Sequence, residues 1–214
     1  MLICGIDEAG RGPVIGPMVI SGFMCEENLL DELTRLEIKD SKKILPNKRE
    51  KIFEKLIKLN AKFFIIKISP KEIDDALESP TINLNWLEAI NTAKIINKLK
   101  PKKAYIDCPS SNCLNYKNYL LNLLDDKNIE LIIEHKADDK YIVSGAASIL
   151  AKVTRDREIV KLKEIYGDFG SGYPSDPKTI EFIKENYNLP IFRKSWNTWK
   201  KAKANKSQKL LSYF

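Results

Sequence analysis

The chain has 214 residues, with 36 Lys plus Arg against 29 Asp plus Glu and a formal net charge of +7. That length fits one domain with a small appendage, and 43% apolar residues are enough for a core, which excludes a disordered or fibrous chain. No apolar run approaches the roughly 20 residues of a membrane span, and no secretory signal is visible. We therefore expect a soluble, cytoplasmic protein that does not contact a membrane.

Apolar patterning along the chain predicts strands first and then an alternation of strands and helices. Strands are expected at residues 2–7, 14–24, 61–68, 104–107 and 130–134, and helices at 82–99, 119–124 and 143–166. A Gly-rich turn, Gly10-Arg11-Gly12-Pro13, follows the first strand. This order predicts an α/β fold, with a mixed β-sheet flanked by helices.

Positive charge is concentrated at the C-terminal end. Residues 188–214 contain no acid and hold seven Lys or Arg residues, whereas the remaining residues hold as many bases as acids. A neutral body with a basic end favours a polyanionic partner such as a nucleic acid. A Lys-rich terminus kept for solubility explains the same pattern equally well.

The four cysteines and the single histidine show no metal-ligand spacing. Cys4 and Cys25 lie in apolar, strand-like segments, and no C-x-x-C occurs around Cys108 and Cys113. A zinc site or a Cys–His nucleophile is therefore not expected. For His135 we expect a structural role at a strand end, with proton transfer as the alternative. Catalysis must then come largely from carboxylates.

Acidic residues occupy the ends of the predicted strands. Asp7 and Asp107 each end a strand, and Asp138 lies between a strand and the long helix. Glu8 would face away from Asp7 on an ideal strand, but Gly10 and Gly12 predict that the strand ends there, which lets the backbone turn and the two acids converge. Carboxylates without His or Cys suit the hard cations Mg²⁺ and Mn²⁺, although any one acid is equally well explained as a cap or turn residue.

Six motifs occur in the order found in type 2 ribonucleases H, and the chain resembles ribonuclease HII, most closely the archaeal form, from about residue 3 to Trp196. These motifs are Asp7-Glu8-Ala9-Gly10-Arg11-Gly12, Asp40-Ser41-Lys42, Tyr105-Ile106-Asp107, Lys136-Ala137-Asp138, Ala146-Ala147-Ser148-Ile149-Leu150-Ala151-Lys152 and Gly170-Ser171-Gly172-Tyr173-Pro174-Ser175-Asp176-Pro177. The resemblance implies a ribonuclease H-like sheet with a C-terminal helical extension. It places a catalytic domain at residues 1–200 and a basic tail at 201–214.

The resemblance also implies an activity and a metal site. Members of the family cut the RNA strand of RNA–DNA hybrids, including single ribonucleotides in duplex DNA, on the 5′ side of the ribonucleotide. The four acids that correspond to its metal ligands are Asp7, Glu8, Asp107 and Asp138. Asp139 competes for the fourth place, but only Asp138 has the family spacing of eight residues to Ala146. We expect a monomeric endonuclease that uses two Mg²⁺ or Mn²⁺ ions and acts in DNA replication and ribonucleotide excision repair.

Substrate contacts follow from the same resemblance. Gly10, Arg11 and Gly12 are expected to bring backbone amides to the ribose 2′-hydroxyl, and Tyr173 to stack on the sugar at the RNA–DNA junction. Further phosphate contacts are expected from a second group of residues, Ser41 and Lys42. Lys152 and Arg155 on the long helix either contact phosphates as well or face solvent.

The C-terminal residues resemble a clamp-binding motif. Leu210, Tyr213 and Phe214 match the pattern by which replication proteins bind the sliding clamp PCNA, but the usual Gln falls one place late, at Gln208. The alternative is a C-terminal helix that folds its apolar residues back onto the domain.

Two other functions compete with a ribonuclease HII activity. One is a ribonuclease H-like DNA nuclease or integrase, which has no need of a 2′-hydroxyl reader. The other is an inactive nucleic-acid-binding module, which would be expected to lose metal acids. One departure from the family pattern is Gly145, where the family usually has Ser before Ala-Ala-Ser, with Ser144 as the neighbour that could compensate.

Overall fold

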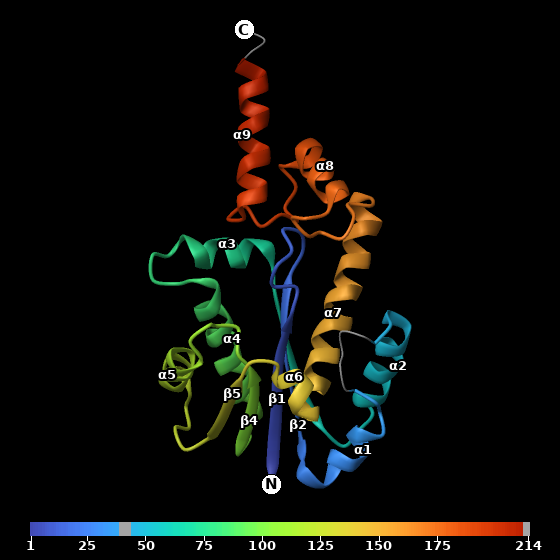
Figure 1. Ribbon diagram of the computed structural model, residues 1–214, viewed down its shortest axis with the longest axis vertical. Coiled ribbons are helices and arrows are strands. Elements are labelled where there is room, and N and C mark those ends of the chain that lie inside the picture. Colours follow the sequence, from blue (N-terminus) through green and yellow to red (C-terminus); the bar gives the residue numbers. More distant parts are fainter. Residues whose placement is uncertain (39–43, 212–214) are drawn as a thin grey trace. The chain divides into compact units, whose positions relative to one another are not determined.

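The computed structural model describes residues 1–38 and 44–211, with side chains described up to residue 204 (Figure 1). The chain forms two compact units. The sheet unit comprises residues 1–9, 19–67 and 84–154, and the helical unit comprises residues 10–18, 68–83 and 155–214. Ser41 and Lys42 lie outside the described residues, as do Tyr213, Phe214 and the side chain of Leu210.

The sheet unit is built on a five-stranded mixed sheet with the strand order β3-β2-β1-β4-β5. The strands are β1 (Leu2–Ala9), β2 (Met18–Glu26), β3 (Lys62–Ile68), β4 (Lys103–Asp107) and β5 (Glu130–Glu134). Strand β1 is antiparallel to β2 and parallel to β4, and β4 is parallel to β5. The predicted mixed sheet is confirmed, and its parallel strands end at one edge, which is where ligand sites of α/β sheets form.

Helices cover both faces of this sheet (Figure 1). The helices of the sheet unit are η1 (Glu27–Leu29), α1 (Leu30–Thr34), α2 (Pro46–Leu56), α4 (Leu84–Leu99), α5 (Cys113–Leu123), α6 (Ala137–Lys140) and the first part of α7 (Ile142–Tyr166). Helix α7 lies against β1 so closely that a Cβ on Gly5 would come within 2.1 Å of the Val143 backbone. On the other face, a Cβ on Gly22 would come within 2.3 Å of Ile95 in α4. Glycine at these two positions therefore lets the helices pack directly on the strands.

The helical unit has its own apolar core. Its helices are α3 (Pro70–Glu78), the second part of α7, α8 (Pro177–Asn186) and α9 (Asn197–Leu211). Val14 and Ile15 lie fully buried in this core with Phe169, Ile183 and Trp199. The predicted strand at 14–24 is therefore wrong at its start, because β2 begins at Met18. Gly10 and Gly16 both have positive φ, so residues 10–17 turn instead of extending.

Several helices were missed by apolar patterning. Helices α2, α3 and α8 are short and rich in charged residues, and α3 buries only Ile73. Their signals are local ones: Pro70 stands in the first turn of α3, and Ser69 and Glu72 form a reciprocal capping box. The predicted helix at 119–124 is the end of α5, which begins at Cys113.

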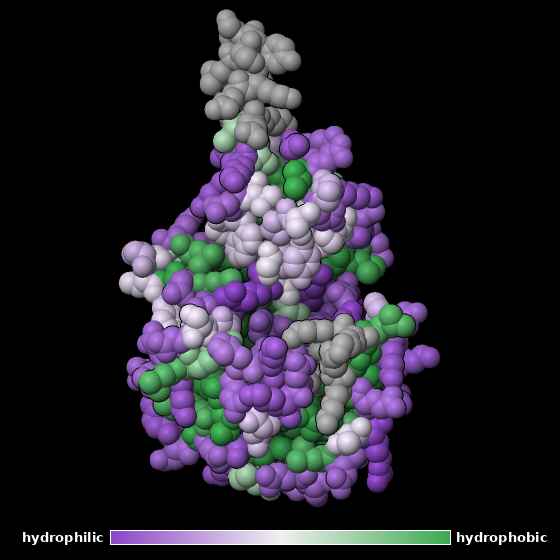
Figure 2. All heavy atoms as spheres, viewed as in Figure 1, coloured by the Kyte–Doolittle hydropathy of each residue, from purple (hydrophilic) through white to green (hydrophobic). Residues whose placement is uncertain are grey.

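Hydrophobic residues lie among hydrophilic ones on the face shown in Figure 2. Within the described residues, no helix combines the length and the apolar character that crossing a membrane requires.

Candidate active site

Asp7 is the buried carboxylate of the sheet edge. It lies near the end of β1 and is only 6% exposed. Its Oδ1 accepts a 2.8 Å hydrogen bond from the Glu8 backbone N–H, and its carboxylate is hydrogen-bonded to Ser148 of α7. Burial raises the pKa of the Asp7 carboxyl well above its ordinary value, and the neighbouring Glu8 carboxylate raises that pKa further.

Asp107 and Asp138 lie at the same edge. Residues Ile6 and Ile106 are paired across the parallel strands β1 and β4, so Asp7 and Asp107 follow at equivalent positions. The Oδ1 of Asp107 accepts a 3.0 Å hydrogen bond from the backbone N–H of Ala137, the residue before Asp138. Asp138 is 3% exposed, and its charge also raises the pKa of Asp7. By contrast, Asp139 is exposed.

Glu8 faces a hollow that holds another acid. The hollow is lined by Asp7, Glu8, Asp107 and Tyr116 and by Glu88 of α4, which is 2% exposed. Strand β1 continues through Ala9 and ends before Gly10, as the glycines predict, although the strand expected at residues 2–7 is two residues too short. The two acids lie within one strand, and both line the same hollow at its edge.

These acids fit a hard cation by their chemistry. All the candidate ligand atoms are carboxylate oxygens, which Mg²⁺ and Mn²⁺ prefer. A bound dication would also relieve the repulsion that Asp7 experiences from Glu8 and Asp138. Among the described residues, no three of these acids bring ligand oxygens within 4.8 Å of one another, so the carboxylates would approach further around an ion.

The glycine turn belongs to the helical unit and is organised by Arg193. Arg193 is completely buried, and its guanidinium donates hydrogen bonds to the carbonyls of Gly10, Arg11 and Gly16 at 2.6, 2.9 and 3.0 Å. Trp196 donates its indole N–H to the Gly12 carbonyl at 3.0 Å. Four carbonyls of the turn are thus held on its inner side by two side chains.

Tyr173 lies against this turn. A Cβ on Gly12 would stand 3.4 Å from the Tyr173 ring, so glycine lets the ring approach the backbone. The Gly172 carbonyl accepts from the Val14 N–H at 2.8 Å, and the Tyr173 ring remains 43% exposed. The structure therefore places the Tyr173 ring against Gly12 of the turn.

The comparisons with known proteins agree with this architecture. A family model described as Ribonuclease HII matches residues 4–199. The chain belongs to the ribonuclease HII family. It is therefore an enzyme, a hydrolase of the metal-binding ribonuclease H class, and the resemblance found in its motifs is confirmed.

Individual relatives cover almost the whole chain. Ribonuclease HII of Thermococcus sibiricus is 47% identical over 208 residues, which is 94% of this chain and 91% of the relative. The crystal structure of ribonuclease H2 from Pyrococcus horikoshii has a TM-score of 0.88 at 42% identity and covers 96% of this chain and 98% of its own. The structure of the PCNA:RNase HII complex from Archaeoglobus fulgidus has a TM-score of 0.83 at 40% identity, with coverages of 92% and 96%.

Lys152 and Arg155 of α7 both contact other side chains of this ribonuclease HII family member. Lys152 donates to the Ser148 hydroxyl at 2.7 Å, and its charge lowers the pKa of Asp7, so Lys152 supports the acid cluster. Arg155 is only 12% exposed, and its guanidinium lies 6.0 Å from the centre of the Tyr173 ring. Neither side chain simply faces solvent.

Ser144 takes no part in the acid cluster. Its hydroxyl donates to the Tyr105 carbonyl at 3.0 Å and ties α7 to β4. A Cβ at Gly145 would lie 3.0 Å from Ile38 and 3.2 Å from the Asp138 carbonyl. Close packing therefore accounts for glycine at the position where the family usually has Ser.

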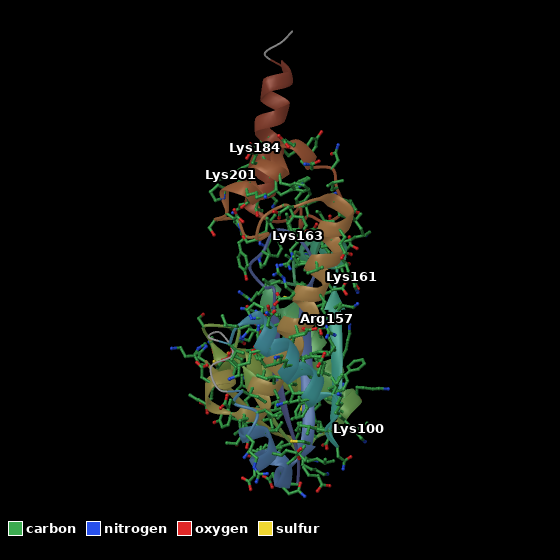
Figure 3. All side chains as sticks on the ribbon, turned by 90° about the vertical axis from the view of Figure 1, so that its right-hand side faces the viewer. Lys100, Arg157, Lys161, Lys163, Lys184 and Lys201 are labelled. Atoms are coloured by element: carbon green, nitrogen blue, oxygen red, sulfur yellow. The ribbon has the colours of Figure 1, made fainter. Side chains whose placement is uncertain are left out.

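Sequence patterns missed two residues of this region. Arg193 was counted among the bases of the acid-free residues 188–214 but is a buried cation that holds the glycine turn. Glu88 was hidden in an apolar helical stripe, and nothing in that stripe marked it as a neighbour of Asp7. Figure 3 shows other bases of the helical unit: Arg157, Lys161 and Lys163 along α7, Lys184 on α8 and Lys201 on α9.

Proposed function

We propose that this chain hydrolyses the RNA strand of RNA–DNA hybrids, including single ribonucleotides embedded in duplex DNA. Cleavage falls on the 5′ side of the ribonucleotide and leaves 3′-hydroxyl and 5′-phosphate ends. Membership of the ribonuclease HII family supports this substrate class. The single observation that carries the proposal is the buried Asp7 carboxylate, whose repulsion from Glu8 and Asp138 a bound cation would relieve.

The proposed metal ligands are Asp7, Glu8, Asp107 and Asp138, and the ions are two Mg²⁺ or Mn²⁺. When bound, such ions activate water and stabilise the charge that develops on the leaving oxygen. A cluster of several acids suits this purpose because two dications repel each other unless carboxylates neutralise them.

The other side chains orient these acids. Lys152 donates to Ser148, and Ser148 bonds to Asp7, so a chain of hydrogen bonds from α7 fixes the Asp7 carboxylate. The Ala137 N–H fixes one oxygen of Asp107. These contacts set the acids in place before substrate arrives, which lowers the cost of reorganisation during the reaction.

Recognition of RNA is proposed to depend on the glycine turn and Tyr173. A protein distinguishes RNA from DNA by contacting the 2′-hydroxyl. The turn has its carbonyls drawn inward by Arg193 and Trp196, and the partly exposed Tyr173 ring lies beside it. Ser41 and Lys42 are proposed as phosphate contacts from the family motif alone, since they lie outside the described residues. A ribonuclease H-like DNA nuclease or integrase is the rival function.

The decisive experiment compares three substrates: duplex DNA with one ribonucleotide, a long RNA–DNA hybrid, and duplex DNA of the same sequence. Each is incubated with Mg²⁺, with Mn²⁺ or with a chelator. We expect metal-dependent cleavage of the first two substrates only, and loss of cleavage with retained binding in Asp107→Asn. Equal cleavage of the all-DNA duplex would establish the rival, and full activity of Asp107→Asn would remove Asp107 from the site.

A matched pair of variants tests the fourth ligand. Asp138→Asn and Asp139→Asn remove the same charge one residue apart, but only Asp138 is buried beside Asp7. We expect the first variant to be inactive and the second to retain nearly full activity. The reverse result would assign the fourth place to Asp139.

We also propose that the C-terminal residues bind a sliding clamp. The support is the motif Leu210-x-x-Tyr213-Phe214 and the similarity to the ribonuclease HII of the Archaeoglobus fulgidus PCNA complex. An apolar turn of this kind fits a hydrophobic groove. Calorimetric titration of the clamp should show binding by the full chain and none by Phe214→Ala, with Ser212→Ala as the matched control. Unchanged affinity in Phe214→Ala would refute the proposal.

A further inference from the structure

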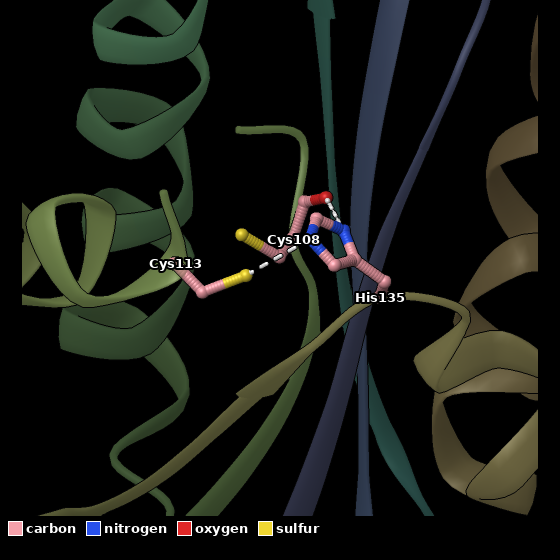
Figure 4. Close-up of side chains that lie close together, drawn as sticks. All are labelled: Cys108, Cys113 and His135. Atoms are coloured by element: carbon pink, nitrogen blue, oxygen red, sulfur yellow. Dashed lines mark hydrogen bonds between the residues drawn. The ribbon is translucent and has the colours of Figure 1, made fainter. Parts of the chain in front are cut away.

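Three soft ligand side chains converge beside the sheet edge (Figure 4). Cys108 follows β4 directly, Cys113 is the first residue of α5, and His135 follows β5 directly. Asp107 and Glu134 are paired in register, and the Cys108 N–H donates to the Glu134 carbonyl at 3.0 Å, so residues 108 and 135 leave neighbouring strands side by side. The sheet topology thus assembles a cluster that the chain spacing does not reveal.

The distances in the cluster match a tetrahedral thiolate–imidazole site. The two sulfur atoms and a ring nitrogen all lie within 4.8 Å of one another, and Cys113 Sγ lies 3.4 Å from His135 Nε2. Zinc bonds of about 2.3 Å to sulfur and about 2.0–2.1 Å to nitrogen put tetrahedral ligands about 3.5–3.8 Å apart. Small side-chain rotations therefore suffice to complete the geometry.

The histidine is already held in the tautomer that binds a metal. His135 Nδ1 lies 3.2 Å from the Cys108 carbonyl, which can only accept a hydrogen bond. The proton of the neutral ring is therefore on Nδ1, and the lone pair of Nε2 faces Cys113. A backbone partner of this kind on the second nitrogen is the usual support of a zinc-bound histidine.

Both thiols lie close to the same backbone carbonyl. Cys108 Sγ and Cys113 Sγ lie 3.2 and 3.8 Å from the same acceptor, the Ser110 carbonyl. Cys108 is buried, Cys113 is half-buried and His135 is exposed, so the cluster has a closed side and an open side. An ion can enter from the open side, and a fourth ligand can reach it there.

We propose that Cys108, Cys113 and His135 bind one Zn²⁺ ion, with the fourth position open to water or another small ligand. Sulfur and imidazole donors select Zn²⁺ over Mg²⁺ or Mn²⁺, so this site is chemically separate from the carboxylates. The ion ties the ends of β4 and β5 to the start of α5. Asp107 directly precedes Cys108, so an ion bound to Cys108 also fixes the strand end that carries Asp107.

The test uses the full chain, reduced and stripped of metal, with Co²⁺ as the optical probe. Sulfur-bound Co²⁺ gives a thiolate charge-transfer band that oxygen-bound Co²⁺ lacks, so ions on the acids do not contribute. We expect the charge-transfer band to reach its maximum at one equivalent of Co²⁺ per chain and to disappear when one equivalent of Zn²⁺ is added. In Cys113→Ser and His135→Gln we expect zinc affinity to fall by at least about 100-fold, more than is typical of losing a supporting contact.

The matched control is Cys25→Ser. This residue lies in the apolar core, so its loss should leave the cobalt signal unchanged. Circular dichroism confirms that each variant is folded. The proposal is overturned if no charge-transfer band appears, if the band survives in both ligand variants, or if anaerobically prepared protein contains a Cys108–Cys113 disulfide instead of free thiols. None of these measurements depends on nuclease activity.

Discussion

Replacing Asp7 by Asn should stabilise the metal-free protein while abolishing its activity. The Asp7 carboxylate is 6% exposed, and its pKa is raised by burial first, then by Glu8 and less strongly by Asp138. Asparagine keeps the oxygen that accepts the Glu8 N–H and removes the charge. Sites that hold destabilising charges for function commonly gain stability when those charges are removed.

The pH dependence follows from the direction of the shift. An acid whose folded pKa lies above its unfolded value of about 3.9 favours the folded state at low pH. That contribution is lost as the pH rises toward the folded pKa. The difference between the Asn variant and the native chain should therefore be small near pH 4 and largest at neutral pH. A gain of about 1–2 kcal/mol is expected there, which corresponds to about 2–8 °C in Tm for a chain of this size.

Thermal unfolding followed by circular dichroism measures this effect, with chelator present, at several pH values between 4.5 and 8. Asp139→Asn at an exposed position is the control and should leave Tm nearly unchanged. Added Mg²⁺ should raise the Tm of the native chain more than that of the variant, because an ion that binds the folded state stabilises it. A variant that is less stable than the native chain at pH 7, or a difference that does not grow with pH, would refute the reasoning.

Three further substitutions test the packing and the turn. Arg193→Met leaves buried carbonyls of the turn without their donor, so the free energy of unfolding should fall by about 3–5 kcal/mol. Urea denaturation measures this loss, and a loss below about 1 kcal/mol would contradict the role of Arg193. Tyr173→Ala should weaken recognition of a single ribonucleotide by about 1–3 kcal/mol in kcat/KM and affect long hybrids less, and equal losses would count against a junction reader. Gly145→Ser should lower stability by about 1–3 kcal/mol because its Cβ meets Ile38 at 3.0 Å, whereas unchanged urea denaturation would show that α7 shifts freely.

The sequence predicts the sheet well because its strands are short, apolar and bounded by clear turn residues. Strand β5 is found at its predicted limits, and β4 and the long helix α7 begin within one residue of theirs. Helices α2 and α8 are missed because they are short and rich in charged residues, so few apolar residues remain to mark them.

The candidate site was only partly accessible to sequence reasoning. The acids could be found because each stands near a strand end and matches a motif. Glu88, Arg193 and the Cys108–Cys113–His135 cluster could not, since their neighbours are set by the parallel pairing of strands or by contacts across most of the chain. Local patterns carry no information about such distant partners.

The dependence of the glycine turn on Arg193 has a consequence for the order in which this protein is completed during synthesis. The three hydrogen bonds from Arg193 span sequence separations of 177, 182 and 183 residues. Contacts of such long range form late, because the intervening chain must first be brought together. During synthesis, all four candidate metal acids are therefore already part of the chain before Arg193, the cation that shapes the turn, has been added. The element proposed to read ribose takes its final form only after Arg193 and Trp196 have been made.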